Sequence, residues 1–460
     1  MALIKSISGI RGTIGGAPGN ALTPLDIVKF TAAYGAWIQH QNISGPIVIG
    51  RDGRISGPMV RDLVAATLSG MGFEVVDLGL STTPTVEMAV VWEKAAGGII
   101  LTASHNPKEW NALKLLNSKG EFISAEDGAW ILNAAEKEEL TFAEVGKLGT
   151  VRDGADYLQK HVDVILDHPL VDKEAIAKAG FKVVVDAINS SGAIAVPQLL
   201  NALGVTEVDV INAEVTGQFA HNPEPLPENL RDLCTRVEKT GAHLGIAVDP
   251  DVDRLCFVNE DGSLFGEEYT LVAVADYILS QKPGNTVSNL SSTRALRDVT
   301  EKHGGQYSGS AVGEVNVVNM MKATNAVIGG EGNGGIIVPE LHYGRDALIG
   351  IALFLTHLAK SGKTIKALRS TYPAYFISKN KIELDPSIDV QKIFNDIRER
   401  YKKQPINDVD GLKIEFDNDW VHLRTSNTEP IIRIYSESST ETTSQNIAKR
   451  LMADIREMMR

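Results

Sequence analysis

Hydrophobic residues in this chain fall into short runs, separated by stretches in which apolar positions recur at helical spacing. The run at residues 46–50 is followed by helical spacing through residues 59–71 and by a second run at residues 73–78. After another helical stretch, a third run occupies residues 98–101. Short apolar runs that alternate with helical patterns predict β-α-β units with a parallel sheet.

The same order of elements recurs twice further along the chain. In the second unit we expect strands at residues 181–186, 207–212 and 244–248 and helices at 197–203 and 228–240; in the third we expect strands at 285–289, 305–310 and 326–329 and a helix ending at Met321. Each third strand leads into a loop rich in polar residues or glycine. Because such loops lie at one edge of a sheet, we expect the three loops to converge on a shared cleft.

The pattern changes after residue 373. We expect helices at residues 345–359, 365–368, 390–402 and 443–459, the first of them buried, and strands at 375–384, 411–416, 420–424 and 431–436. The predicted fold class is α/β, with three topologically similar α/β domains and a C-terminal α+β domain around a central cleft. We place these domains at residues 1–153, 154–255, 256–370 and 371–460.

The length and charge of the chain exclude some classes of protein. With 460 residues the chain is too long for a single core. Its net charge of −13 argues against a nucleic-acid partner, which needs a positive face to neutralise phosphates. An anionic small-molecule substrate would require a local basic pocket.

Cysteine usage and hydropathy point to a cytoplasmic protein without a membrane partner. The two cysteines, Cys234 and Cys256, form no C-x-x-C pattern for metal or redox chemistry. The N-terminus lacks the long apolar core of a signal peptide. No apolar run approaches the roughly 20 residues that a membrane-spanning helix requires.

The loop at residues 102–107, Thr-Ala-Ser-His-Asn-Pro, follows the third apolar run and offers a nucleophile. A strand that ends in small and polar residues presents a hydroxyl at the sheet edge where ligands bind. Ser104 is therefore a candidate nucleophile, with His105 and Lys114 as proton handlers or charge partners. The alternative is a solvent-exposed turn.

Three aspartates, Asp249, Asp251 and Asp253, alternate after the third strand of the second unit. Alternation lets all three carboxylates point to one place, and a set of oxygen ligands suits a hard cation such as Mg²⁺. A solvated turn is the alternative. The spacing also approaches a calcium loop, with Glu260 at its twelfth place, but Arg254 stands where that loop needs glycine.

Two further loops have compositions that suit a sugar phosphate. Residues 424–430 combine an arginine with hydroxyl and amide side chains, which suits a phosphate group. In the loop at residues 329–335, Glu331 and Asn333 can bind sugar hydroxyls, while the glycines allow close approach. The glycine loop lacks the Lys-Ser/Thr of a Walker A sequence. Hairpin turns are the alternative for both loops.

These four loops, taken together, resemble those of the α-D-phosphohexomutases. The serine, metal, sugar and phosphate loops occur in the family's order, and the resemblance extends from Gly9 to the C-terminal helix. It implies that Ser104 is carried as phosphoserine and that Mg²⁺ is held by this phosphate together with the three aspartates. It also implies transfer of the phosphoryl group to a hexose monophosphate, through a sugar 1,6-bisphosphate that serves as intermediate and activator.

The resemblance also implies roles for individual residues. Near the reacting phosphate it places Arg11, His105, Lys114 and Arg254; at the other phosphate it places Arg424, Ser426, Asn427 and Thr428; and at the sugar it places Glu331 and Asn333. We expect Lys114 to transfer a proton if neighbouring cations lower its pKa.

Several positions are similar to archaeal-type phosphoglucosamine mutases. Pro250, Asn333 and Gly335 stand where better-known bacterial members carry glycine, serine and histidine, and Glu314 stands where many carry histidine. Glu314 can meet a substrate ammonium group, so we expect conversion of glucosamine 6-phosphate to glucosamine 1-phosphate.

Other functions remain open at this point. The tripeptide at residues 426–428 also resembles phosphomannomutases, so a phosphomannomutase/phosphoglucomutase is the first alternative. A metal-dependent sugar phosphatase and a non-catalytic sugar-phosphate binder are more distant. A serine hydrolase is disfavoured because Gly-x-Ser-x-Gly is absent around Ser104. We expect small sugar phosphates as partners and a monomer or homodimer.

Overall fold

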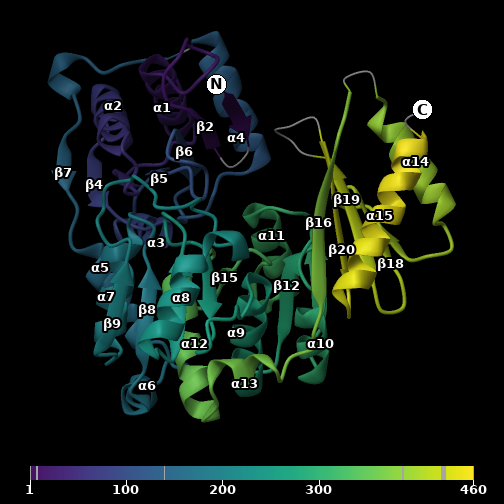
Figure 1. Ribbon diagram of the computed structural model, residues 1–460. Helices are drawn as coiled ribbons and strands as arrows, with labels where there is room; N and C mark the ends of the chain where they lie inside the picture. The colour runs from purple at the N-terminus through teal and green to yellow at the C-terminus, as the bar shows by residue number, and fades with distance from the viewer. Residues whose placement is uncertain (1, 7–8, 139, 386–387, 426–430, 459–460) are drawn as a thin grey trace. The chain divides into compact units, whose positions relative to one another are not determined.

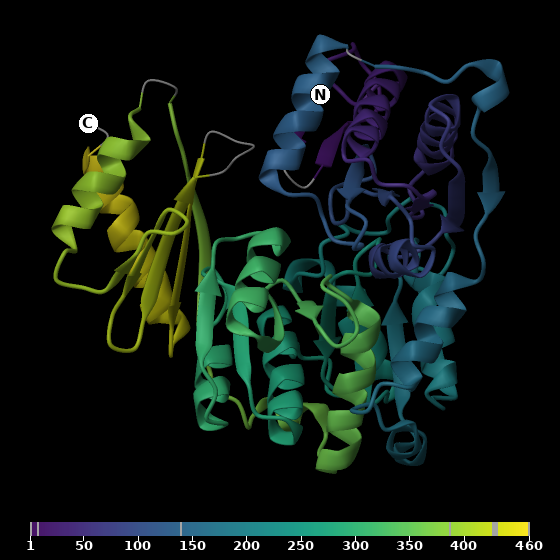
Figure 2. The same ribbon diagram turned by 180° about the vertical axis from the view of Figure 1, so that it is seen from behind.

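The computed structural model describes residues 2–6, 9–138, 140–385, 388–425 and 431–458. The chain forms two compact units, each built from two stretches of sequence. The first contains Met1–Thr270 and Gly334–Leu368, and the second contains Leu271–Asn333 and Arg369–Arg460. Figures 1 and 2 show the elements of both units from opposite sides.

The first unit begins with a seven-stranded sheet in the order β1-β2-β6-β5-β3-β4-β7. Its strands are β1 (Leu3–Ser6), β2 (Gly9–Thr13), β3 (Ile47–Arg51), β4 (Val75–Leu80), β5 (Gly97–Leu101), β6 (Trp110–Leu116) and β7 (Val151–Asp153). Its helices are α1 (Pro24–His40), α2 (Gly57–Gly70), α3 (Thr83–Trp92) and α4 (Ala125–Lys137), with a 3-10 turn at Val145–Lys147.

A second sheet of the first unit has the order β11-β10-β8-β9. Its strands are β8 (Lys182–Asp186), β9 (Glu207–Ile211), β10 (Leu244–Val248) and β11 (Leu255–Val258). The accompanying helices are α5 (Tyr157–Leu166), α6 (Lys173–Ala179), α7 (Gly192–Ala202) and α8 (Arg231–Thr240), with a 3-10 turn at Pro227–Asn229. Strand β15 (Gly335–Ile337) and helices α12 (Ala347–Ser361) and α13 (Ile365–Arg369) follow later in the chain.

Helix α12 is the buried helix that its apolar sequence predicts. Its residues from Ala347 to Thr356 are all buried, and the Phe354 ring stacks on Phe257 of β11 with 3.8 Å between the ring centroids. Asp346 caps the helix by accepting hydrogen bonds from two backbone amides of the first turn. An acidic N-cap satisfies amides that the helix itself leaves unpaired.

The second unit contains a parallel three-strand ladder and an antiparallel sheet. The ladder consists of β12 (Asn285–Asn289), β13 (Tyr307–Ser310) and β14 (Ala326–Glu331), with helices α10 (Ala295–Lys302) and α11 (Glu314–Thr324). Helix α9 (Glu267–Gln281) begins in the first unit and ends in the second.

The antiparallel sheet has the order β16-β20-β19-β18-β17. Its elements are β16 (Phe376–Glu383), α14 (Val390–Arg400), β17 (Ile406–Asn407), β18 (Leu412–Glu415), β19 (Trp420–Thr425), β20 (Ile431–Ser438) and α15 (Glu441–Met458). Apolar residues of α14 and α15 pack with those of the strands in one core. Both helices therefore cover the same face of the sheet (Figure 1).

The three α/β sheets share one topology, as the repeated sequence pattern predicts. In the first, β3 pairs in parallel with β4 on one side and β5 on the other. Strand β8 pairs in the same way with β9 and β10, and β12 with β13 and β14. The predicted fold class, three similar α/β domains followed by an α+β domain, is thus confirmed.

Some predicted elements differ from the structure. We expected a helix at residues 197–203, but α7 begins five residues earlier and contains Pro197 in its interior. We expected one helix at 228–240, but a 3-10 turn precedes a shorter α8. Strands β1, β2 and β6 and helices α1 and α4 were not expected. Strands β1 and β2 are short, and their register depends on the pairing of β1 with β2 and of β2 with β6, which no local pattern reveals.

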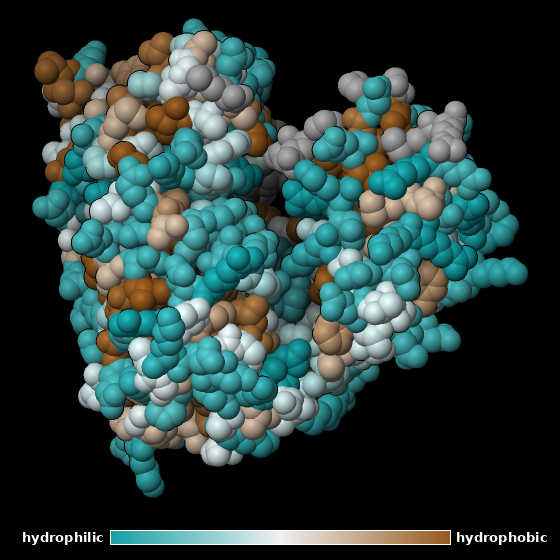
Figure 3. Space-filling model, in the orientation of Figure 1, coloured by the Kyte–Doolittle hydropathy of each residue, from teal (hydrophilic) through white to brown (hydrophobic). Residues whose placement is uncertain are grey.

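The visible surface is mainly hydrophilic. Figure 3 shows apolar residues in small separate groups on this face. Within the part of the chain that the structure describes, no helix combines the length and the apolar character needed to cross a membrane.

Candidate active site

The loop after β5 holds Ser104 in a strained conformation. Ser104 has a φ of 49°, in the left-handed region that a serine rarely adopts. Its backbone amide donates to Thr102 Oγ1 at 2.9 Å, and its hydroxyl donates to Asp249 Oδ2 at 2.6 Å. A backbone that is strained by about 1–3 kcal/mol persists only where its surroundings enforce it, as they often do in active sites. The structure therefore brings the candidate nucleophile against the aspartate loop.

Arg54, which lies between β3 and α2, organises this loop. Its buried guanidinium forms an ion pair with Asp52, with 3.0 Å between Nε and Oδ2. It also donates to four backbone carbonyls of the serine loop and its exit, those of Ser104, Asn106, Pro107 and Trp110. The signal in the sequence was the Arg-Asp-Gly-Arg stretch at residues 51–54, which begins with the last residue of β3.

We expect Arg54→Lys to lower kcat by about 100-fold, because an ammonium cannot bind four carbonyls at once and a shift of the nucleophile of about 1 Å has that effect. Melting temperature and kcat would be measured together. Arg61→Lys is the matched control, since Arg61 pairs with Asp62 and Asp77 away from the loop. A kcat equal to that of the wild type would contradict the positioning role.

The loop after β10 brings three aspartates to one point. The ligand atoms of Asp249, Asp251 and Asp253 lie within 4.8 Å of one another, and all three residues are buried. Asp249 Oδ1 accepts the backbone amides of Asp253 and Arg254, each at 3.1 Å. Val252 has a φ of 62°, an outlier for a β-branched residue. The turn is thus strained in a way that aims the carboxylates at one another.

The carboxylates of this loop are only partly satisfied by protein groups. Oδ1 of Asp251 and Oδ1 of Asp253 are buried and have no hydrogen-bond partner among the described residues. Burial and then the charges of Asp253 and Asp251 raise the pKa of Asp249 well above its usual value. Hard carboxylate oxygens in mutual repulsion fit a divalent cation such as Mg²⁺, which takes oxygen ligands.

Two residues that the sequence analysis missed fix the aspartates in place. The Thr83 hydroxyl, at the start of α3, donates to Asp251 Oδ2 at 2.6 Å. Arg345 Nη2 donates to Asp253 Oδ2 at 2.7 Å. Neither residue carries a sequence signal, because each reaches the loop only through the packing of distant segments.

Lys114 contacts the same carboxylates. Its Nζ lies 2.7 Å from Asp251 Oδ2 and 3.6 Å from Asp253 Oδ2. Burial opposes the charged form, but the two carboxylates outweigh it and raise the pKa of Lys114 to about 12. This is the opposite of the lowered pKa on which the predicted proton transfer depended.

The other predicted groups of the first unit gather around Ser104. His105 Nδ1 lies 3.3 Å from Ser104 Oγ. Burial, followed by the charges of Arg254 and Arg11, lowers the pKa of His105 well below its usual value, so its ring is neutral at pH 7. Arg11, Ser104 and Lys114 line one small cavity of about 40 Å³.

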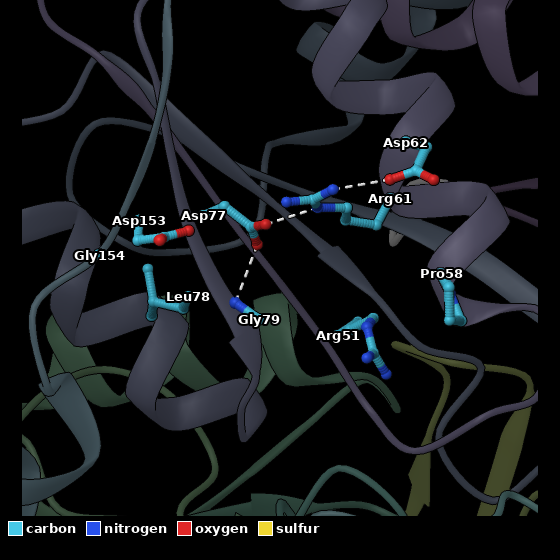
Figure 4. A pocket seen from close by; sticks show the side chains of 9 residues that line it. All are labelled: Arg51, Pro58, Arg61, Asp62, Asp77, Leu78, Gly79, Asp153 and Gly154. Carbon is cyan, nitrogen blue, oxygen red and sulfur yellow. Dashed lines mark hydrogen bonds and ion pairs between the residues drawn. The ribbon is translucent and has the colours of Figure 1, made fainter.

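A larger pocket of about 360 Å³ lies elsewhere in the first unit (Figure 4). None of the predicted site residues lines it. Its Arg61 side chain extends between Asp62 and Asp77, which bind it from both sides. The cations of this pocket are thus partly neutralised, so it is a poor candidate for a phosphate site.

The predicted sugar-binding residues lie in the second unit. Glu331, at the end of β14, is buried and accepts from Asn289 Nδ2 at 2.9 Å and from the Gly313 amide at 3.2 Å. Asn333 Nδ2 lies 3.4 Å from Glu331 Oε2. Glu314 is the first residue of α11 and is also buried. The structure therefore brings the loop after β14 together with the start of α11.

The phosphate loop is described only at its first residues. The Arg424 side chain lies near Asp410, with 3.5 Å between Nη1 and Oδ2. The same carboxylate oxygen accepts a hydrogen bond from the Val312 backbone amide at 2.9 Å. Ser426, Asn427 and Thr428 lie outside the described residues.

Comparison with known proteins defines the class. Models of the four domains described as phosphoglucomutase/phosphomannomutase domains I, II, III and the C-terminal domain match residues 3–142, 156–262, 266–375 and 384–457. The fold is that of a phosphohexomutase, an isomerase of sugar phosphates. The chain belongs to the phosphoglucomutase/phosphomannomutase family, and the predicted resemblance is confirmed.

Relatives with several names are similar to this chain. A phosphoglucomutase/phosphomannomutase from Thermococcus kodakarensis is 36% identical, with 94% of each chain covered. A probable phosphoglucosamine mutase from Methanopyrus kandleri is 34% identical, with 98% of each covered. Among solved structures, a phosphoglucomutase/phosphomannomutase family protein from Burkholderia thailandensis has a TM-score of 0.84 at 25% identity, covering 99% of this chain and 97% of its own.

Proposed function

We propose that this phosphohexomutase converts glucosamine 6-phosphate to glucosamine 1-phosphate by way of phosphoserine at Ser104. The observation that carries the proposal is the 2.6 Å hydrogen bond from the Ser104 hydroxyl to Asp249 in the aspartate loop. A hydroxyl held against a cation site is arranged for phosphoryl transfer, in which positioning and charge neutralisation supply most of the catalysis.

In the first step the bond between phosphorus and Ser104 Oγ breaks, and a bond forms to the C1 hydroxyl oxygen of the sugar 6-phosphate. The proton of that hydroxyl passes to Ser104 Oγ, and the product is a sugar 1,6-bisphosphate. After the sugar turns over, the bond between phosphorus and the C6 oxygen breaks as a bond forms to Ser104 Oγ, and the serine proton passes to the C6 oxygen. The net change is isomerisation, and the enzyme ends as phosphoserine. Free bisphosphate would act as an activator, because it phosphorylates any Ser104 that has lost its phosphoryl group.

Asp249, Asp251 and Asp253 would hold Mg²⁺, together with an oxygen at Ser104. Bound there, the cation would neutralise charge on the phosphoryl group. Arg11 and Arg254 supply further positive charge, and the neutral His105 ring supplies a hydrogen-bonding group. We retain Lys114 as the candidate for proton transfer, on the strength of its position in the cavity that Ser104 lines.

Further residues would bind the remainder of the substrate. We assign Glu331 and Asn333 to the sugar hydroxyls, and Arg424 with Ser426, Asn427 and Thr428 to the phosphate that does not react. Preference for the amino sugar is assigned to Glu314, whose carboxylate can pair with an ammonium group. The relative named probable phosphoglucosamine mutase supports this choice.

A coupled mutase assay tests the proposal. Glucosamine, mannose and glucose 6-phosphates would be compared by kcat/KM, with Mg²⁺ and a trace of the matching bisphosphate. We expect the highest value for glucosamine phosphate. A preference for mannose or glucose phosphate would instead favour a phosphomannomutase/phosphoglucomutase, the name of the Thermococcus relative. Free phosphate released as fast as isomer would favour a phosphatase, and binding without turnover a non-catalytic binder.

Glu314→Gln tests whether Glu314 causes the preference for the amino sugar. We expect kcat/KM for glucosamine phosphate to fall by about 10-fold, because a charge-assisted contact of about 1.5 kcal/mol or more is lost. The value for glucose phosphate should change little. Equal loss for both sugars would show that Glu314 supports the start of α11 rather than selecting the substrate. Glu301→Gln, in the neighbouring helix α10, is the matched control.

A further inference from the structure

A second group of potential metal ligands lies in the first unit, apart from the aspartate loop. It consists of His161 on α5, together with His342 and Asp346 in the segment before α12. The candidate ligand atoms of these residues lie within 4.8 Å of one another. His161 and Asp346 have fully buried side chains, and that of His342 is 11% exposed. The reaction proposed above uses none of them.

The inner atoms of this cluster converge on one carboxylate oxygen. His161 Nε2 lies 2.9 Å from Asp346 Oδ2, and His342 Nε2 lies 3.2 Å from the same oxygen. In a tetrahedral site with bonds of about 2.0 Å, neighbouring ligand atoms stand about 3.3 Å apart. The three atoms thus need only small movements to surround a metal ion.

The second polar atom of each of these side chains also lies near a polar group. His161 Nδ1 lies 2.9 Å from Thr85 Oγ1, and His342 Nδ1 lies 3.3 Å from Glu87 Oε2. Asp346 Oδ1 accepts two backbone amides at the start of α12. Metal-binding histidines characteristically hold their second nitrogen in this way, because the outer partner fixes ring orientation and tautomer. The structure shows a hydrogen-bonding partner of this kind for His161 and for Asp346, whereas His342 Nδ1 has the ion-pair contact with Glu87.

The hydroxyl partner of His161 is compatible with a metal-binding tautomer. Thr85 Oγ1 lies 2.7 Å from Thr82 Oγ1 and can donate to it while accepting from His161 Nδ1. In that arrangement Nε2 presents its lone pair toward Asp346 Oδ2, and a cation can bind between the two atoms.

Charge also favours a cation here. Asp346 and Glu87 bring two carboxylates into a volume with almost no solvent contact, where they face two imidazoles. A divalent ion would neutralise both acids while the imidazoles stay uncharged. Gly344 lets the backbone pass close to the cluster, since a Cβ there would lie 1.9 Å from Glu87 Oε2.

We propose that His161, His342 and Asp346 form a second metal site, for a zinc-class divalent ion, that ties α3, α5 and the segment before α12 together. Two imidazoles and a carboxylate suit zinc and its neighbours in the transition series, whereas Mg²⁺ prefers the all-oxygen aspartate loop. Helices α3 and α5 pack against each other in the first unit (Figure 1). The site is structural and independent of the substrate proposed above.

The test uses chelator-treated full-length protein, titrated with Co²⁺ and with Zn²⁺ while excess Mg²⁺ occupies the aspartate loop. Visible absorption of Co²⁺ reports its coordination geometry, calorimetry reports stoichiometry, and thermal unfolding reports stabilisation by the bound ion. We expect one equivalent to bind and to raise the melting temperature. Loss of a group that hydrogen-bonds to a metal ligand weakens metal binding by roughly 10–100-fold. His161→Gln and His342→Gln each remove a ligand itself, so each should weaken binding by more than that.

Two control variants and one conservative variant sharpen the test. Asp251→Asn should leave Co²⁺ binding intact. His303→Gln should do the same, because it removes a histidine that pairs with Asp276, outside the proposed site. Thr85→Val, nearly isosteric, should weaken binding by about 10-fold.

Three results would overturn the proposal. They are no Co²⁺ or Zn²⁺ binding by the wild type in the presence of Mg²⁺, unchanged binding in both histidine variants, and loss of binding in Asp251→Asn alone. If the histidine variants fail to fold, anomalous diffraction from wild-type crystals soaked in Zn²⁺ decides. A peak between His161 and His342 supports the site, and its absence refutes it.

Discussion

Ser104→Ala is expected to lower kcat by roughly 10⁴-fold or more, as the removal of a covalent nucleophile does in other enzymes. The Ser104 hydroxyl donates to Asp249, and alanine removes it without leaving a large cavity. The left-handed backbone at this position is held by the contacts of Arg54 with the loop carbonyls, which alanine leaves in place. We therefore expect a folded protein that binds substrate and does not turn it over.

The measurement combines the coupled mutase assay with intact-mass spectrometry. Wild-type protein incubated with sugar bisphosphate should gain the mass of one phosphoryl group, and the variant should not. Ser69→Ala, which removes a hydroxyl bonded to the Gly149 carbonyl, is the matched control and should keep full activity. Substantial mutase activity in Ser104→Ala would refute the phosphoserine mechanism.

Asp251→Asn is expected to raise the Mg²⁺ concentration for half-maximal activity by more than about 10-fold. The substitution keeps the size of the side chain but removes one of three converging charges. It also changes the ion pair with Lys114, whose Nζ lies 2.7 Å away. Burial raises the pKa of Asp251, but Lys114 and the Thr83 hydroxyl outweigh this effect and lower it, so the native residue is an anion ready for a cation.

Initial rates and calorimetry, each titrated with Mg²⁺, separate binding of the ion from its effect on turnover. Asp261→Asn is the control, because Asp261 forms an exposed ion pair with Lys366 in the same unit. An unchanged Mg²⁺ titration in Asp251→Asn would show that the ion binds elsewhere.

Periodicity and loop composition determined much of this protein from its sequence. Three repeats of strand, helix and strand were predicted because apolar spacing is a local property, and β10 and β12 have the predicted bounds. Helix starts such as that of α3, with Thr82 as N-cap and Pro84 in the first turn, follow from local chemistry in the same way. The four candidate loops were predicted because each places reactive or ligating side chains directly after or between apolar runs.

The tertiary structure decided which side chains support those loops. Arg54 reaches carbonyls about 50 residues away in sequence, and Thr83 reaches Asp251 across 168 residues. His161 meets Asp346 across 185 residues. Contacts of this kind depend on how sheets and helices pack, and no pattern of spacing encodes them. For the same reason, the sequence did not reveal that the pKa of Lys114 is raised. The sequence shows the cations near it in the chain, whereas the carboxylates that raise its pKa arrive only with the fold.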